Sequence, residues 1–511
     1  MKADTTRRFL ALHTWMGLLA GMALFVAFYA GAITVFSHEI ADWNRSGAAA
    51  VAPANPVART QTLLDDLLKK HPEAASSVYL ALPGEHGPQP SAYWIAPGAD
   101  TARRFALDDG KALHEDAFGQ RFIEYIYDLH FTAGLPKPFG TYFFGAVCLL
   151  YGLALVSGVV IYAPILVRNL FALRLGKNLK RLWQDSHNAV GVLSLPFHVV
   201  FAWSGAVLAL GLMVFVPFQR AVYDGKLLQL TEQDFYGAPQ LAAAHVPKPT
   251  LPLDTLLQRG QAALPAMTIE GIWLVNAGDA NARATIYGEL SQRRLSQMAT
   301  VTLDAGTGAV VATVAPKTMT PGMVFMRGLQ ALHFGNFGHN TVKWLYFVLG
   351  LAGAFLFYSG NLLWIETRRK RRQAEQPLRT RVMAALTLGI CLGCVAGVSA
   401  VFIAGALVPA AAAAPVYLSV FFASVLWAGL RQPTHAGHEL LWLCALLTAA
   451  IPLAGWVGSG EHLFAAAWHG HWHRFFVDAV ALLLACVYGR MARATLHRGR
   501  TGEPNSVWAL R

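Results

Sequence analysis

Eight long apolar runs constrain the fold of this chain more than any other feature of its sequence. A helix needs about 20 apolar residues to cross the hydrocarbon core of a bilayer. Only 14% of the residues are charged, against about 25% in soluble domains. The sequence therefore predicts a mainly α-helical polytopic membrane protein with about eight transmembrane helices. The runs lie at 9–36, 140–164, 186–216, 341–365, 381–408, 413–431, 438–457 and 474–492.

Lysine and arginine gather at alternate ends of these runs, which predicts the orientation of the chain. They precede the first run and follow the second, fourth and eighth, so the positive-inside rule predicts cytoplasmic N- and C-termini. The net charge of +12 then reflects membrane topology rather than nucleic-acid binding. The basic residues are Lys2, Arg7, Arg8, Arg168, Arg174, Lys177, Lys180, Arg181, Arg368, Arg369, Lys370, Arg371, Arg372, Arg490, Arg493, Arg498 and Arg500.

The chain contains an internal repeat in which histidine and glycine recur at matched positions. Two apolar runs begin with His-x-x-x-Gly, and each has a second glycine 18 residues after its histidine. Two other runs are preceded by Leu-His-Phe and contain Ser-Gly at nearly matching offsets. Histidines at a membrane edge are costly, so a repeated set indicates a function. The repeat positions are His13, Gly17, Gly31, His130, Ser157 and Gly158 in one half, and His187, Gly191, Gly205, His333, Ser359 and Gly360 in the other.

Two long segments between the runs, 39–139 and 217–340, are expected on the outer side of the membrane. Each reads as a short helix, near 60–71 and 253–264, followed by strands and a hairpin at 105–113 or 301–311. The predicted division is 1–38 (first span), 39–139 (first outer domain), 140–216 (second and third spans), 217–340 (second outer domain), 341–372 (fourth span and basic loop) and 373–511 (C-terminal extension with about four spans).

The helix-plus-hairpin pattern of the two outer segments resembles the small PepSY domain. Together with the histidine-glycine runs, residues 1–370 resemble the PepSY-associated transmembrane family. The resemblance implies a bacterial inner-membrane protein with two α+β PepSY-like periplasmic domains. That family includes iron-regulated inner-membrane proteins and ferric-siderophore reductases of Gram-negative bacteria. Its marks here are His13 with Gly17, Leu129 with His130, His187 with Gly191, Pro196-Phe197-His198, and Leu332 with His333.

The repeated histidines have the chemistry of haem ligands. A neutral imidazole binds haem iron, and a b-type haem between helices takes two of them. A glycine one turn beyond the histidine leaves room for the macrocycle beside the backbone. His13 and His187 are expected to share an inner haem, and His130 and His333 an outer one. These histidines, as the iron ligands, predict a protein that binds two b-type haems.

His198 complicates this pairing. It follows His187 by 11 residues, which returns to nearly the same face of a continuous helix about 16 Å further along. One helix holding two haems would let His198 pair with His130 or with His333 instead. The sequence leaves these alternatives open.

The C-terminal extension carries a second histidine cluster, Trp-His-Gly-His-Trp-His, before its last run. His469, His471 and His473 would converge on a metal if the segment were extended, because alternate side chains of an extended chain share one side. An interfacial anchor made of tryptophan and histidine is the alternative.

The family resemblance implies an oxidoreductase that passes electrons across the membrane to a ferric siderophore and releases Fe(II) for iron uptake. No dinucleotide or Walker motif is present in the sequence, so the electrons are expected from a cytoplasmic or quinol donor. Two alternatives are a PepSY-based binding or regulatory module and a siderophore or metal transporter.

Overall fold

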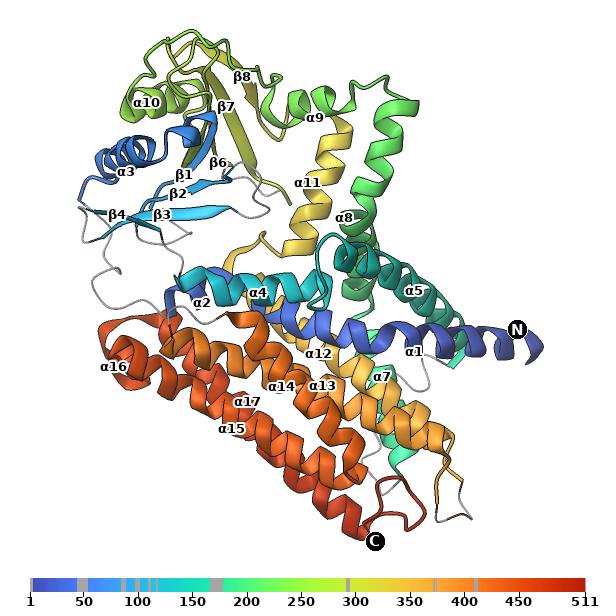
Figure 1. Cartoon of the computed structure of the whole chain (residues 1–511). Helices are drawn as coiled ribbons and strands as arrows, with labels where there is room; N and C mark the ends of the chain where they lie inside the picture. Colours follow the sequence, from blue (N-terminus) through green and yellow to red (C-terminus); the bar gives the residue numbers. More distant parts are fainter. Residues whose placement is uncertain are drawn as a thin grey trace. The chain divides into compact units, whose positions relative to one another are not determined.

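The computed structural model describes residues 3–43, 54–83, 89–96, 102–108, 112–115, 118–165, 178–290, 295–370, 373, 375–408 and 412–510. Lys2, Arg168, Arg174, Lys177, Arg371 and Arg372, which contributed to the predicted topology, lie outside these residues. The chain divides into two compact units (Figure 1). The first comprises Met1–Asn44, Arg121–Leu212 and Gly338–Arg511, and the second comprises Arg45–Gln120 and Met213–Phe337.

Eight helices in the described part of the chain are long and apolar enough to cross a membrane. Each matches one of the predicted apolar runs, which confirms a multi-pass membrane protein. They are α1 (Ala3–Thr34), α5 (Phe139–Tyr162), α8 (Leu195–Ala221), α12 (His339–Thr367), α13 (Leu378–Leu407), α14 (Ala413–Leu430), α15 (Pro433–Ser459) and α17 (Trp472–Thr501). Shorter helices of the first unit are α2 (Ser37–Trp43), α4 (Phe118–Thr132), α7 (Leu179–Leu193) and α16 (Leu463–His469).

The third predicted run is interrupted. The sequence predicted one continuous helix over 186–216, but α7 ends at Leu193 and α8 begins at Leu195. Proline lacks an N–H and clashes with the preceding turn, so it favours the first turn of a helix, which is where Pro196 lies in α8. The expectation that His187 and His198 share one uninterrupted helix face is therefore wrong.

The helices after residue 370 pack closely through small residues. On α13, Gly389, Gly393 and Gly397 recur every four residues and face α14. A Cβ at Gly389 would lie 2.7 Å from Cα of Val425. Without a hydrophobic driving force between helices in lipid, such close backbone approach supplies the packing contacts.

The second unit is built around one antiparallel sheet of eight strands, in the order β4-β3-β2-β1-β5-β6-β7-β8. The strands are β1 (Ser77–Ala81), β2 (Ser91–Trp94), β3 (Arg103–Asp108), β4 (Ala112–Glu115), β5 (Met267–Val275), β6 (Arg283–Leu290), β7 (Met298–Asp304) and β8 (Val310–Val314). The helices of this unit are α3 (Pro56–Lys70), α9 (Leu227–Tyr236), α10 (Leu253–Ala263) and α11 (Pro321–Phe334).

The two outer segments each contribute one α+β half to this sheet. Their first strands pair, with Ser77 opposite Val275 and Ala81 opposite Gly271. The predicted helices are α3 and α10, which contact each other and bury leucines against the sheet. The predicted hairpins are β3–β4 and β7–β8. The pairing of β1 with β5 covers what would be an exposed edge of each half.

The shared sheet also constrains the topology. One half of the sheet follows the first long helix in the chain, and the other half follows the third. Strands of one sheet must lie on the same side of a membrane, because a lipid-exposed backbone cannot satisfy its hydrogen bonds. Because both halves follow an odd-numbered span, the first and the third, the chain emerges on the same side of the membrane each time.

The packing of α13 on α14 yields a test of this arrangement. Gly393→Leu would place a side chain against the α14 backbone, where a Cβ already lies 3.2 Å from the carbonyl oxygen of Phe421. We expect a loss of about 1–3 kcal/mol, typical of overpacking, measured by thermal unfolding in detergent. Gly429→Leu is the control, since no atom lies within 4 Å of a Cβ at that position. Equal stability of the two variants would contradict the packing.

Candidate functional site

Two histidines from the two halves of the repeat face each other in the helical unit. His13 lies on α1 and His187 on α7. Their ring centroids are 6.1 Å apart, with the ring planes inclined by 70°. Both are half-buried. The structure thus brings together the two histidines that the sequence paired.

Three residues of the facing helix α5 lie around the imidazole of His13. Its Nδ1 lies 2.8 Å from the carbonyl oxygen of Ala154 on α5. The Ser157 hydroxyl lies 3.0 Å from the same carbonyl oxygen and 2.7 Å from that of Leu153, so it shares its hydrogen between the two. A Cβ at Gly158 would lie 3.1 Å from the imidazole. The Ser-Gly pair therefore supports the acceptor carbonyl and leaves space for the ring.

His187 is held in the same way by α12. Its Nδ1 lies 3.1 Å from the carbonyl oxygen of Leu356. The Ser359 hydroxyl donates to that carbonyl at 3.0 Å, and a Cβ at Gly360 would lie 3.2 Å from the ring. Both halves of the repeat thus use one arrangement: a carbonyl, a serine three residues on, and a glycine four residues on.

This arrangement sets the protonation of each ring. A carbonyl oxygen only accepts, so Nδ1 of His13 and of His187 must carry the hydrogen. In a neutral imidazole the other nitrogen, Nε2, then presents a lone pair. Neither Nε2 has a hydrogen-bond partner within the described part of the chain. A fixed Nδ1–H and an available Nε2 are typical of a metal-binding histidine.

The spacing of the two rings fits a shared iron. An imidazole nitrogen lies about 2 Å from a bound metal, so two rings that hold one ion from opposite sides have centroids about 6 Å apart. The glycine one turn after each histidine leaves space nearby. Nothing lies within 4 Å of a Cβ at Gly17, and a Cβ at Gly191 would meet only a Leu356 methyl group at 3.5 Å. These residues therefore fit the pair of imidazoles that would hold a b-type haem.

His130 repeats the same carbonyl and glycine pattern near the other end of α1. Its Nδ1 lies 2.7 Å from the carbonyl oxygen of Ala27, and a Cβ at Gly31 would lie 2.6 Å from that nitrogen. Burial lowers the pKa of His130 more than its hydrogen bond to Ala27 raises that pKa. This lowered pKa favours the neutral imidazole, the form that binds a metal.

His198 is fully buried between two hydroxyl groups. Tyr151 hydrogen-bonds its Nδ1, and Ser194 lies 2.9 Å from its Nε2. Both ring nitrogens are thus engaged, in contrast to His13 and His187. Its role as a haem ligand stays a prediction, and the geometry is that of a satisfied polar group in the bundle.

His333 lies on α11, in the second unit, where it is half-buried. The shared haem of His130 and His333 stays a prediction.

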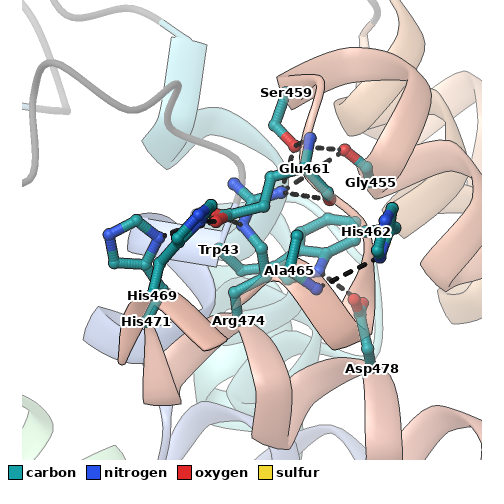
Figure 2. A network of polar contacts seen from close by, with 10 residues as sticks. All are labelled: Trp43, Gly455, Ser459, Glu461, His462, Ala465, His469, His471, Arg474 and Asp478. Atoms are coloured by element: carbon teal, nitrogen blue, oxygen red, sulfur yellow. Dashed lines mark hydrogen bonds and ion pairs between the residues drawn. The ribbon is translucent and has the colours of Figure 1, made fainter. Parts of the chain in front are cut away.

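The C-terminal histidines separate into two groups. His469 and His471 both contact the Glu461 carboxylate: their Nδ1 atoms lie 2.8 Å and 2.9 Å from its Oε1. Figure 2 shows these three side chains together beside Arg474. Burial by itself raises the pKa of Glu461, but the hydrogen bonds from the two histidines bring that pKa below its ordinary value. The carboxylate is therefore ionised.

His473 points elsewhere, with its Nδ1 3.6 Å from Asp42 of α2. The expectation that His469, His471 and His473 share one side is therefore wrong for His473, because α17 begins at Trp472 and helical geometry turns His473 away. Sequence reasoning also missed Glu461. Its signal was a carboxylate eight residues before His469 in the same short connection.

A cavity of about 330 Å³ lies in the helical unit next to His473, between α1, α12, α13, α15 and α17. It is lined mainly by apolar side chains, together with Glu39, which forms a half-buried ion pair with Lys343. His13, His130, His187 and His198 do not line it. The cavity is therefore separate from the histidine pair.

The fold and the paired histidines define a multi-pass membrane protein with a duplicated helical core and an inserted sheet unit. The family described as the PepSY-associated TM region matches residues 10–367, and the chain belongs to this family. It is also 25% identical over 361 residues to an uncharacterised protein of Pseudomonas aeruginosa, covering 66% of this chain and 89% of that protein. Helices α13 to α17 lie beyond the family match.

The contacts of His198 predict a stability effect. Tyr151→Phe removes one of its two hydrogen bonds and leaves a buried ring nitrogen without a partner. We expect a loss of about 1–3 kcal/mol, measured by thermal unfolding in detergent. Tyr142→Phe is the control on the same helix, since its hydroxyl has no partner within the described residues. An unchanged midpoint for Tyr151→Phe would show that His198 does not depend on this contact.

Proposed function

We propose that the protein is a b-haem-containing membrane reductase that delivers electrons to a ferric siderophore. The observation that carries the proposal is the pairing of His13 with His187, each with Nδ1 held by a helix carbonyl and Nε2 available. A haem at this position supplies a one-electron carrier inside the membrane. The acceptor is inferred from the resemblance to ferric-siderophore reductases.

In this proposal each residue of the histidine pair has a defined task. His13 and His187 would hold the haem iron through Nε2. Ala154 and Leu356 keep the Nδ1 hydrogens in place through their carbonyl oxygens, which fixes the orientation of both rings.

The overall reaction moves one electron from a reduced donor to Fe(III) in the chelate. The donor is a membrane quinol or a cytoplasmic reductant, and the products are the oxidised donor, Fe(II) and the free siderophore. One quinol would reduce two ferric chelates, one electron at a time, and release two protons. Siderophore oxygens are hard ligands that hold Fe(II) less tightly than Fe(III), so reduction releases the metal. The sheet unit would form the docking surface for the acceptor.

The proposed orientation places both termini in the cytoplasm and the sheet unit in the periplasm of a Gram-negative bacterium. Its support is the distribution of lysine and arginine at the ends of the spans. Under this orientation His13 lies near the cytoplasmic edge. His130, which packs some 14–18 residues further along α1, lies roughly 20–27 Å away along the helix axis, toward the periplasmic edge.

The first experiment is a reduced-minus-oxidised visible spectrum of the full chain in detergent, with haem quantified against protein. We expect sharp α and Soret bands at about two haems per chain. His13→Ala and His187→Ala should each lose about one haem, because either change removes an axial ligand. His497→Ala, at an exposed histidine of α17, is the control and should keep the full content.

The same samples separate the alternatives. Reduced protein should be re-oxidised by a ferric siderophore, with Fe(II) trapped by a colorimetric chelator. A folded protein without haem, after expression with ample haem supply, would overturn the reductase and favour a binding module. Substrate flux into vesicles without haem would instead favour a transporter.

A glycine on the facing helix gives a sharper test of the same site. Gly158→Leu adds a side chain where a Cβ would already lie 3.1 Å from the His13 ring, so the ring must move. We expect the loss of about one haem although every histidine is retained. Gly152→Leu is the matched control on α5, because a Cβ there meets no atom within 4 Å. Equal haem content in the two variants would contradict the proposed position of the haem.

A further inference from the structure

The connection between α15 and α17 gathers three ligand atoms on one side. The helix α16 ends at His469, and α17 is preceded by His471. Gly470 between them has a left-handed backbone, with φ of 77°. This conformation, which glycine adopts without strain, lets the two flanking imidazoles approach each other. Their ring centroids are 5.8 Å apart.

Glu461 supplies the third atom and is held in place from behind. Gly460, also left-handed with φ of 78°, ends α15 directly before it. The buried Arg474 approaches Oε2 of Glu461 at 3.4 Å and also hydrogen-bonds Ser459 (Figure 2). Nδ1 of His469 lies 2.8 Å from Oε1, whereas Nδ1 of His471 lies 2.9 Å from Oε1 and 2.8 Å from Oε2, so the carboxylate that Arg474 holds faces both imidazoles.

We propose that Glu461, His469 and His471 form a binding site for a divalent transition-metal ion. Ligand atoms from the three residues all lie within 4.8 Å of one another, close enough to surround one ion. Two imidazoles and one carboxylate form a ligand set typical of Fe(II) and Zn(II) sites that keep open positions. This site does not depend on the proposed haem.

The exposure of these side chains suits an exchangeable ion. Side-chain exposure is 55% for His469 and 38% for His471, whereas it is 16% for Glu461. Each Nδ1 now donates its hydrogen to the carboxylate. When Nδ1 binds a metal, the hydrogen moves to Nε2, because the lone pair of Nδ1 is then used by the ion. Open coordination positions are then filled by water or by a ligand that arrives with the metal.

The neighbouring histidines do not belong to the site. His462 uses its Nδ1 to accept a hydrogen bond from the backbone N–H of Ala465, which caps α16. His473 contacts Asp42 instead. His473 therefore provides a control within the same segment.

The test is calorimetric titration of the chelator-treated full chain in detergent with Zn²⁺. We expect one site that is lost, or weakened by at least about tenfold, in Glu461→Gln and in the double variant His469→Ala/His471→Ala. His473→Ala should bind as the unchanged protein does. Mg²⁺ should not compete, because it prefers sites made of oxygen ligands alone.

A spectroscopic measurement distinguishes ligation from a loss of folding. Co²⁺ bound to the unchanged protein should give visible d–d bands that the double variant lacks, while both proteins elute as the same species in gel filtration. Zn²⁺ binding of equal strength in the unchanged protein and the double variant would overturn the site. So would the absence of binding in the unchanged protein, which would leave the three residues as an ion-paired end of α15 and α17.

Discussion

The hydrogen bond from a histidine Nδ1 to a helix carbonyl is the interaction on which the functional core depends. It occurs at His13, at His187 and at His130, each time opposite a glycine four residues after the acceptor. A side chain at that glycine would occupy the place of the ring. The bond fixes the tautomer, and the glycine fixes how closely the two helices approach. Both conditions must hold before two Nε2 atoms can face one point.

The packing of the neighbouring helices supports this functional core. α1 packs on both α5 and α12, so the helix that carries His13 also contacts the helices that orient His13 and His187. The C-terminal helices share a hydrophobic cluster with α1 and pack through the glycines of α13. The sheet unit has its own separate core, in which the leucines of α3 and α10 pack on apolar residues of the strands. Two independent cores allow the membrane helices and the sheet to vary separately.

Much of this architecture was predictable from local patterns. The eight apolar runs and the helices near 60–71 and 253–264 follow from periodicity. The hairpin that comes after each of these two helices follows from its turn residues. The pairing of His13 with His187 followed from the repeat. The role of the Ser-Gly pairs did not, because it requires knowing that Ser157 and Gly158 lie opposite His13. The break at Ser194 was also missed, although Pro196 was a visible signal for it.

The sequence by itself determined the membrane character, the number of long helices and the duplicated histidines, because hydrophobic length and spacing act along the chain. Only the tertiary structure decided which groups meet. It joined two insertions into one sheet through the pairing of β1 with β5. It also placed Glu461 against His469 and His471, and placed His473 against Asp42. Such contacts depend on the relative placement of distant backbone segments, which packing sets and which no local pattern encodes.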